Sequence, residues 1–186
     1  VEHLAACRAI PGLVVIRPAD ARETSEAYRA ALAFDDRPVA LVLTRQGLPT
    51  LGPPAGGAGA GRGGYVLCQS GEGTPDVILI GTGSEVQICL AAYESLAAAG
   101  RNVRVVSLPS WELFEVQSDD YRESVLPRSV SCRVAVEAGI VQGWERYLGD
   151  NGKFIGMNSF GASAPYEQLY EHFGITPEAV VEAANA

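Results

Sequence analysis

Two arginines in this sequence are placed where a side chain at the end of a strand could bind an anion. Arg17 directly follows the apolar segment LVVI, and Arg45 follows VALVLT. In open parallel sheets ligands bind beyond the carboxyl ends of the strands, and the planar guanidinium suits phosphate or carboxylate. We expect Arg17 to pair locally with Asp20 or Glu23. Arg45 has no acidic neighbour within several residues, so an anion-binding role and a structural role both stay open.

A glycine-containing turn is the second candidate site. Gly81 and Gly83 stand in ILIGTGSEV, between a predicted strand and a predicted helix, as they do in the dinucleotide motif G-x-G-x-x-G. Val86 occupies the third glycine position, and no G-x-x-x-x-G-K-[ST] sequence is present. A tight strand-to-helix turn accounts for both glycines without a phosphate ligand, so we predict a structural turn.

The remaining motifs favour neither a hydrolase nor a metal site. GASAP, around Ser163, resembles the nucleophile elbow G-x-S-x-G, but Pro165 stands where glycine is needed. Only His3 and His172 could serve that serine as a base. GDNG (149–152) is typical of a loop turn. No cluster of His, Cys, Asp or Glu has the spacing of metal ligands.

Composition limits the partners. The 186 residues carry a formal net charge of −8, which argues against nucleic acid or an anionic membrane, because either requires a clustered basic face. No apolar run approaches the roughly 18 to 20 residues that span a bilayer, and the first residues do not have the charged-then-apolar pattern of a leader, so we expect no marking for export. The four cysteines form no CxxC pair, so we expect reduced thiols in a cytoplasmic protein.

The elements that position these residues follow from apolar runs and helix caps. Strands are expected in LVVI and VALVL, with a helix between them that opens on the capping-box pair Asp20 and Glu23. Two strands and their helices enclose too little core to fold alone. We therefore expect residues 1–51 to be the end of a larger α/β domain whose front is missing. A flexible Gly/Pro-rich linker is expected at 52–64.

Residues 65–186 are numerous enough for a domain of their own. Strands are expected at 65–69, 76–81, 103–108, 133–138 and 153–157. Helices are expected at 84–98 (capped by Ser84 and Gln87, stopped at Gly100), from Ser110, near Ser118, at 165–172, and at 177–185 after Thr176-Pro177. This alternation predicts an α/β domain with a parallel sheet.

Long segments along nearly the whole chain, the linker excepted, resemble the carboxyl-terminal third of a transketolase. They are VEHLAACRAIPGLVVIRPADARET, ALVLTRQGLPTL, PDVILIGTGSEVQICLAAYESLAAAG, VRVVSLPSWELFEVQSDDYRESVLP, RVAVEAG and FIGMNSFGASAP. The resemblance implies an incomplete βαβ piece from the end of a pyrimidine-binding domain (1–51), the linker, and a C-terminal domain (65–186). This last domain is implied to be a Rossmann-like three-layer α/β/α fold with a mostly parallel sheet.

The family transfers a two-carbon ketol unit from a ketose phosphate to an aldose phosphate in the pentose phosphate pathway. The resemblance implies thiamine diphosphate, Mg²⁺ or Ca²⁺, sugar phosphates and a homodimer for the complete enzyme, with the missing N-terminal portion as partner. Arg45, in TRQ, matches the arginine that holds the substrate phosphate, although Gly47 replaces the family's usual Asn. The family's substrate histidine would lie ahead of Val1, so His3 inherits no role.

The family's metal–diphosphate motif, activating glutamate and stacking aromatic residue are missing from this sequence. The chain alone is therefore expected to bind no cofactor or metal, to hold no catalytic residue and to be inactive. Two alternatives stay open. One is a free-standing Rossmann-like binding or regulatory module, and the other is a part of a sibling thiamine enzyme such as a dihydroxyacetone synthase.

Overall fold

The computed structural model describes residues 1–54, 57 and 59–186. The first part of the chain contains α1 (His3–Arg8), β1 (Val14–Ile16), α2 (Ala21–Leu32) and β2 (Val39–Leu41). The second part contains the 3₁₀ helices η2 (Ala60–Arg62) and η3 (Gly83–Glu85) and the strands β3 (Tyr65–Gln69), β4 (Val77–Gly81), β5 (Val103–Ser107), β6 (Arg133–Val136) and β7 (Lys153–Ile155). Its helices are α3 (Val86–Ala98), α4 (Trp111–Glu115), α5 (Asp119–Val125), α6 (Glu145–Leu148), α7 (Tyr166–His172) and α8 (Pro177–Asn185).

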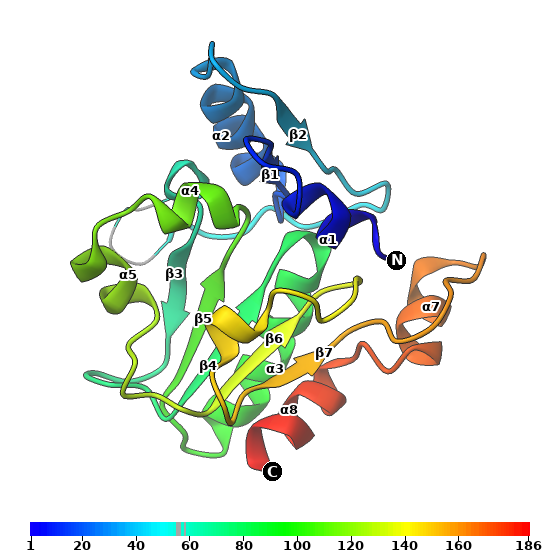
Figure 1. The fold of residues 1–186 in the computed structure, drawn as a ribbon. Helices are drawn as coiled ribbons and strands as arrows, with labels where there is room; N and C mark the ends of the chain where they lie inside the picture. The colour runs from blue at the N-terminus through cyan, green and yellow to red at the C-terminus, as the bar shows by residue number, and fades with distance from the viewer. Residues whose placement is uncertain (55–56, 58) are drawn as a thin grey trace.

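The first part is the predicted βαβ unit. β1 and β2 pair in parallel and are joined by α2, separate from the larger sheet (Figure 1). Both strands are shorter than the sequence predicts. The core below this small sheet contains Val14, Ile16 and Ala27 together with Leu113 of α4. The unit therefore completes its core with a side chain from the second part, as expected for a piece with too few apolar residues of its own.

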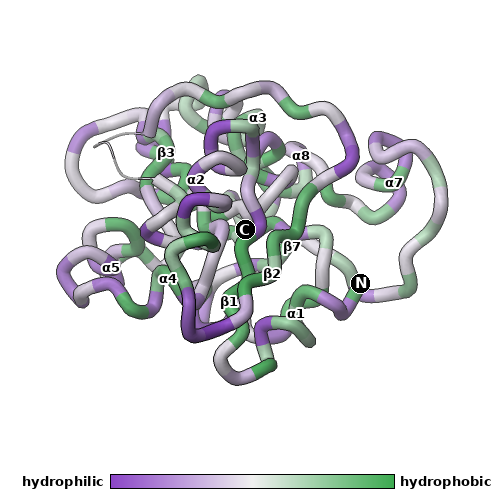
Figure 2. The backbone as a smooth tube through the Cα atoms, turned by 90° about the horizontal axis from the view of Figure 1, so that it is seen from above, coloured by the Kyte–Doolittle hydropathy of each residue, from purple (hydrophilic) through white to green (hydrophobic). Residues whose placement is uncertain are grey.

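The second part is a three-layer α/β/α domain, which confirms the predicted fold class. Its sheet has the order β3-β5-β4-β6-β7, in which β3 runs antiparallel and the other four strands run parallel. One face packs on α3 and α8, and the other packs on α4, α5 and α6. β4 is buried along its whole length because both faces are covered. Seen from above, β1, β2 and β7 are marked by green hydrophobic segments (Figure 2).

Most predicted helix boundaries are confirmed. Ser110, Ser118 and Thr176 cap α4, α5 and α8 with their hydroxyl groups, and Gly100 ends α3 with φ of +85°. The capping box at Ser84 and Gln87 is wrong. The 3₁₀ helix η3 precedes α3, and the Ser84 hydroxyl donates instead to the Glu85 carboxylate at 2.8 Å.

The predicted linker contains ordered structure at its second end. Its residues Ala55, Gly56 and Ala58 lie outside the described residues. Ala60 is buried, and its N–H donates to Glu26 of α2 at 2.6 Å. A Cβ on Gly63 would lie 2.2 Å from the backbone nitrogen of Phe114. The end of the Gly/Pro-rich stretch is therefore held by burial between α2 and α4, contrary to the expectation of a flexible linker over all of 52–64.

Candidate functional site

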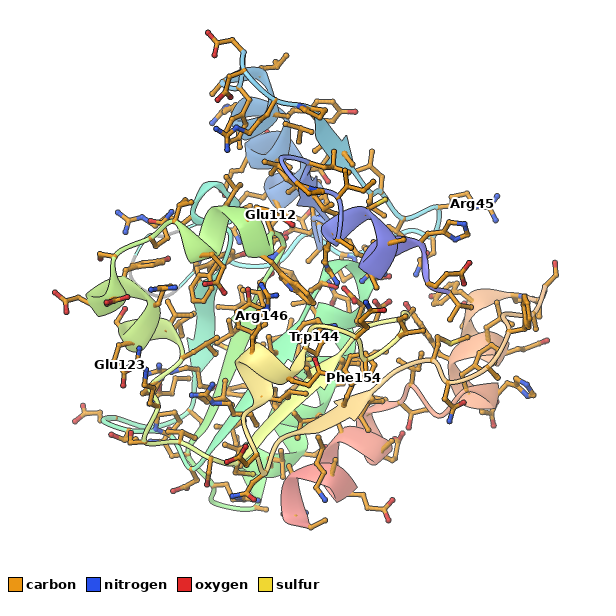
Figure 3. All side chains as sticks on the ribbon, in the orientation of Figure 1. Arg45, Glu112, Glu123, Trp144, Arg146 and Phe154 are labelled. Carbon is orange, nitrogen blue, oxygen red and sulfur yellow. The ribbon has the colours of Figure 1, made fainter. Side chains whose placement is uncertain are left out.

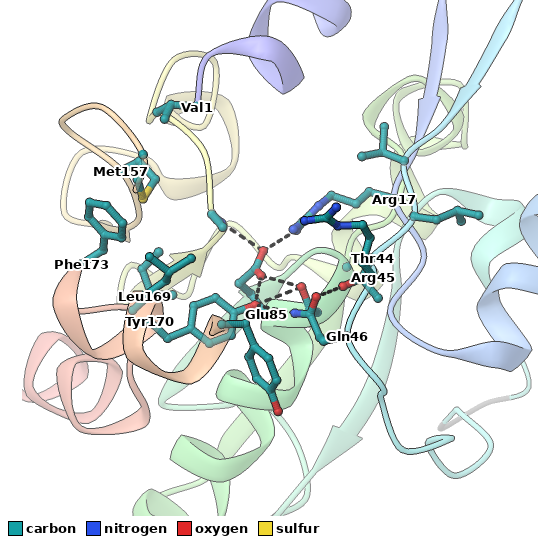
Figure 4. A pocket seen from close by; sticks show the side chains of 18 of the residues that line it. Val1, Arg17, Thr44, Arg45, Gln46, Glu85, Met157, Leu169, Tyr170 and Phe173 are labelled. Carbon is teal, nitrogen blue, oxygen red and sulfur yellow. Dashed lines mark hydrogen bonds and ion pairs between the residues drawn. The ribbon is translucent and has the colours of Figure 1, made fainter. Parts of the chain in front are cut away.

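A cavity of about 520 Å³ lies where the two parts of the chain meet (Figure 4). Its polar lining comes from residues that follow β1, β2 and β4: Arg17, Thr44, Arg45, Gln46, Ser84 and Glu85. Its apolar lining comes from α7 and neighbouring segments: Met157, Leu169, Phe173 and Ile175. The cavity therefore opens at the carboxyl ends of strands from both sheets, which is where α/β proteins bind ligands.

Arg45 belongs to the polar lining and is exposed. Its side chain points away from the body of the fold (Figure 3). No ion pair or hydrogen bond joins the Arg45 guanidinium to another described residue, in contrast to the buried arginines discussed below. The guanidinium therefore remains available to an anion from solution.

The turn that carries Arg45 is attached to α7. The Gln46 side-chain amide donates to the Tyr170 hydroxyl at 3.3 Å, and the Thr44 hydroxyl donates to the Gln46 side-chain oxygen. Tyr170 in turn donates to Glu85 at 2.5 Å. A residue of the second part thus holds the neighbour of Arg45, a contact that the sequence pattern does not indicate.

The predicted local pairing of Arg17 with Asp20 or Glu23 is wrong. The Arg17 side chain is 11% exposed and forms an ion pair with Glu85, which is fully buried. The same guanidinium donates to the backbone and side-chain oxygens of Thr82 at 2.6 and 2.8 Å. Arg17 is therefore a link between the two parts, because its side chain turns toward the ends of the larger sheet.

A second buried ion pair joins the parts. Arg8 at the end of α1 donates with both terminal nitrogens to the Glu137 carboxylate, at 2.8 and 2.7 Å. The two side chains are 5% and 1% exposed. The guanidinium also lies 3.9 Å from the ring centroid of Trp111. Sequence reasoning missed Glu137, although it directly follows the apolar residues VAV (134–136), the same pattern that singled out Arg17 and Arg45.

Glu23 makes a further link between the two parts. Asp20 caps α2 as predicted, accepting from the Glu23 N–H at 2.7 Å. The Glu23 carboxylate is buried and accepts from Tyr65 at 2.6 Å and from Ser107 at 2.5 Å. Burial raises the pKa of Glu23, and these hydrogen bonds offset the rise only in part. At Glu137 the balance is opposite: burial disfavours the charge, but the hydrogen bonds and charge of Arg8, together with the charge of Arg17 and the hydrogen bond of Thr82, outweigh it and lower the pKa.

These opposite shifts predict opposite pH dependences for Glu137→Gln and Glu23→Gln. Because the pKa of Glu137 is lowered in the folded state, its stabilising contribution is present above the ordinary value of 4.5 and is lost as the pH falls through the folded value. Because the pKa of Glu23 is raised, its ionised form is penalised, and the penalty is relieved as the pH falls toward 4.5. As the pH is lowered, chemical unfolding should show wild type gaining stability relative to Glu23→Gln above pH 4.5 and losing stability relative to Glu137→Gln below pH 4.5. Parallel curves for the two variants would contradict these assignments.

The other candidate motifs form no reactive site. Ser163 and both histidines, His3 and His172, are exposed, and no hydrogen bond joins the serine to either imidazole among the described residues. GDNG (149–152) forms a turn, as predicted. All four cysteines are free thiols, and burial raises the pKa of Cys68 to about 11. The described part of the chain contains no group of three His, Cys, Asp or Glu side chains that could hold a metal ion.

The fold and cavity together define an α/β protein in which a βαβ unit packs against the strand ends of a Rossmann-like domain. Two family models match the chain: "Transketolase, pyrimidine binding domain" over residues 1–50 and "Transketolase-like TK C-terminal domain" over residues 63–176. The chain belongs to the transketolase family. No helix in the described parts is long and apolar enough to cross a membrane.

Individual relatives agree with the family models. Transketolase 7 of Craterostigma plantagineum is 54% identical over 188 residues, which include all of this chain and 28% of the relative. A relative from Solanum tuberosum, 51% identical over all of this chain and 25% of its own length, is named as a chloroplastic transketolase. The chain thus spans about a quarter of these relatives.

Solved structures give the same result. A Pichia stipitis transketolase in complex with sedoheptulose-7-phosphate superposes with a TM-score of 0.88 at 40% identity, covering 98% of this chain and 26% of that one. A protein described as a split gene transketolase, an inactive β4 tetramer, has a TM-score of 0.76 at 26% identity and covers 98% of this chain and 60% of that one.

Proposed function

We propose that this chain serves in the thiamine-diphosphate-dependent transfer of a two-carbon ketol unit from a ketose phosphate to an aldose phosphate, in the pentose phosphate pathway. Within that reaction, Arg45 binds the substrate phosphate. The observation that carries the assignment is the exposed guanidinium at the carboxyl end of β2, beside the cavity and without an ion-pair partner among the described residues. No observation favours the sibling dihydroxyacetone synthase over this activity.

The domain boundaries, the partners and the location are inferred together with this activity. We assign residues 1–51 to the pyrimidine-binding domain, 52–64 to the connection and 65–186 to the C-terminal domain. The partners are an N-terminal portion that supplies the rest of the enzyme, a second copy in a homodimer, and sugar phosphates. We place the enzyme in the cytoplasm, with a plastid as the alternative because a relative is named as chloroplastic.

The residues of this chain do not fit thiamine diphosphate or its Mg²⁺ or Ca²⁺. The described residues offer no cluster of metal ligands. The buried carboxylates of Glu85 and Glu137 are already bound to arginines, and the turn at Gly83 is filled by Arg17. These observations support assigning cofactor and metal to the portion outside this chain, and we expect the isolated chain to be inactive.

Titration calorimetry of this chain with thiamine diphosphate and Mg²⁺ tests the division of labour. We expect no binding tighter than millimolar and no ketol transfer by the chain alone. Adding a separately produced N-terminal portion of a family member should restore both. Cofactor binding by the isolated chain would contradict the proposal, as would a reconstituted mixture that binds cofactor but transfers no ketol unit.

A further inference from the structure

The C-terminal domain has a crevice of the kind that binds ligands in doubly wound folds. Its chain runs from β4 to β5 on one side and then to β6 on the other, so the direction of winding reverses between β4 and β6. The loops after these two strands place Thr82, Glu85 and Glu137 at this switch point. In open α/β sheets the switch point is the general position of a bound ligand.

Arg17 fills this crevice. The Gly83 N–H donates to the Arg17 carbonyl at 3.0 Å, so a backbone donor that could hold a phosphate is already occupied. A Cβ on Gly83 would lie 2.7 Å from the Arg17 guanidinium carbon. The glycine turn is therefore structural, as predicted. Gly83 is required there for a second reason as well, because a side chain at this position would collide with the guanidinium of Arg17.

The crevice is built for a cation. The Glu85 carboxylate forms an ion pair with Arg17. It also accepts hydrogen bonds from the Ser84 hydroxyl, the Tyr170 hydroxyl and the N–H of Ala138, at 2.8, 2.5 and 3.0 Å. Glu85 is fully buried. A buried carboxylate with this support repels phosphate and requires a positive partner. The position is therefore unsuited to a nucleotide.

The neighbouring carboxylate repeats the arrangement. Glu137 accepts from Thr82 at 2.6 Å and from the Trp144 indole at 3.1 Å. Its remaining capacity is taken by the two nitrogens of Arg8, whose plane is covered by Trp111. A planar guanidinium can donate two parallel hydrogen bonds to one carboxylate while its face stacks on an aromatic ring, and an ammonium group cannot do both.

We propose that the switch-point crevice of the C-terminal domain is a guanidinium receptor whose ligands are arginines of residues 1–50 in the same chain. Recognition of the planar guanidinium is by Glu137, which binds both terminal nitrogens of Arg8, while Thr82 and Glu85 bind one terminal nitrogen of Arg17. The ligand crevice of this domain thereby serves to dock the pyrimidine-domain segment. This arrangement also argues against a free-standing nucleotide-binding module.

Arg8→Ala, made in the 186-residue chain, tests the receptor by chemical rescue, because Arg8 makes the bidentate contact with Glu137. Methylguanidinium is the probe, at about 10 mM, far below the molar concentrations that unfold proteins. It should raise the Tm of Arg8→Ala saturably, by roughly 3 to 6 °C when its concentration is about ten times its Kd. Wild type and Arg8→Lys, whose side chains occupy the position beside Glu137, should not respond. Arg37→Ala, which removes an exposed arginine, is the matched control and should not respond either.

Three results would overturn the proposal. One is the absence of any saturable response of Arg8→Ala to methylguanidinium. Another is an equal response to methylammonium at the same ionic strength, which would show that charge alone is recognised. The third is unchanged affinity in Arg8→Ala/Glu137→Gln, where about a tenfold loss or more is expected because a charge-assisted bond is removed. If Arg8→Ala is unfolded without probe, the same titration should restore its folded circular dichroism signal, and failure to do so also counts against the receptor.

Discussion

Arg8→Met should destabilise this chain by about 3 to 5 kcal/mol, the loss typical of removing one partner from a buried ion pair. The Glu137 carboxylate would remain at 1% exposure without its cation. The contact of the guanidinium with Trp111 is lost as well. For a chain of this size the loss corresponds to a fall in Tm of roughly 6 to 20 °C. Chemical and thermal unfolding would measure it, and hydrogen exchange should place the lost protection mainly in residues 1–50.

Two comparisons separate charge burial from simple loss of a side chain. Arg37→Met removes an arginine from a pair with Asp36, whose members are 45% and 57% exposed, and should leave stability unchanged. Arg8→Met/Glu137→Gln should recover much of the loss, because the amide can still accept from Trp144 and leaves no charge buried. If Arg8→Met were as stable as Arg37→Met, Arg8 would not hold the two parts together.

The regular elements could be predicted because their signals are local. Apolar runs in LVVI and DVILIG give strands buried on both faces, and Ser110 or Thr176 caps a helix that begins one residue later. These choices depend on neighbours within about four residues. The sheet order is consistent with the alternation of strands and helices, since parallel neighbours need a crossover between them.

The links between the two parts could not be predicted in the same way. The sequence favours nearby acids as partners of Arg17, but its partner Glu85 is 68 residues away, and Arg8 and Glu137 are 129 residues apart. Separation along the sequence does not indicate which acidic residue pairs with a given arginine, because the pairing depends on which charged side chains are buried together in the fold. The sequence does contain one signal for such a partner: Glu137 is an acidic residue at the end of an apolar strand.

Arg45 differs from both buried arginines, and this difference defines its test in an active enzyme reconstituted from this chain and the proposed N-terminal portion. Arg45→Ala should raise KM for phosphorylated substrates by about 10- to 150-fold, which corresponds to a charge-assisted contact of roughly 1.5 to 3 kcal/mol. A contact with a phosphate remote from the reacting bond is made equally in ground and transition states, so kcat should change little. Steady-state kinetics with matched phosphorylated and unphosphorylated acceptors would measure the effect.

Controls on this chain separate phosphate binding from a structural role for Arg45. Arg45→Lys keeps the charge but loses the planar fork, so it should recover only part of the affinity. Arg128→Ala removes another exposed arginine, 85% exposed beside Glu123, and should alter neither kinetic constant. Since Arg45 is exposed and has no ion pair among the described residues, Arg45→Ala should also leave Tm unchanged. Equal losses with phosphorylated and unphosphorylated substrates, or a lowered Tm, would show that Arg45 supports the turn held by Gln46 and Tyr170 rather than the substrate.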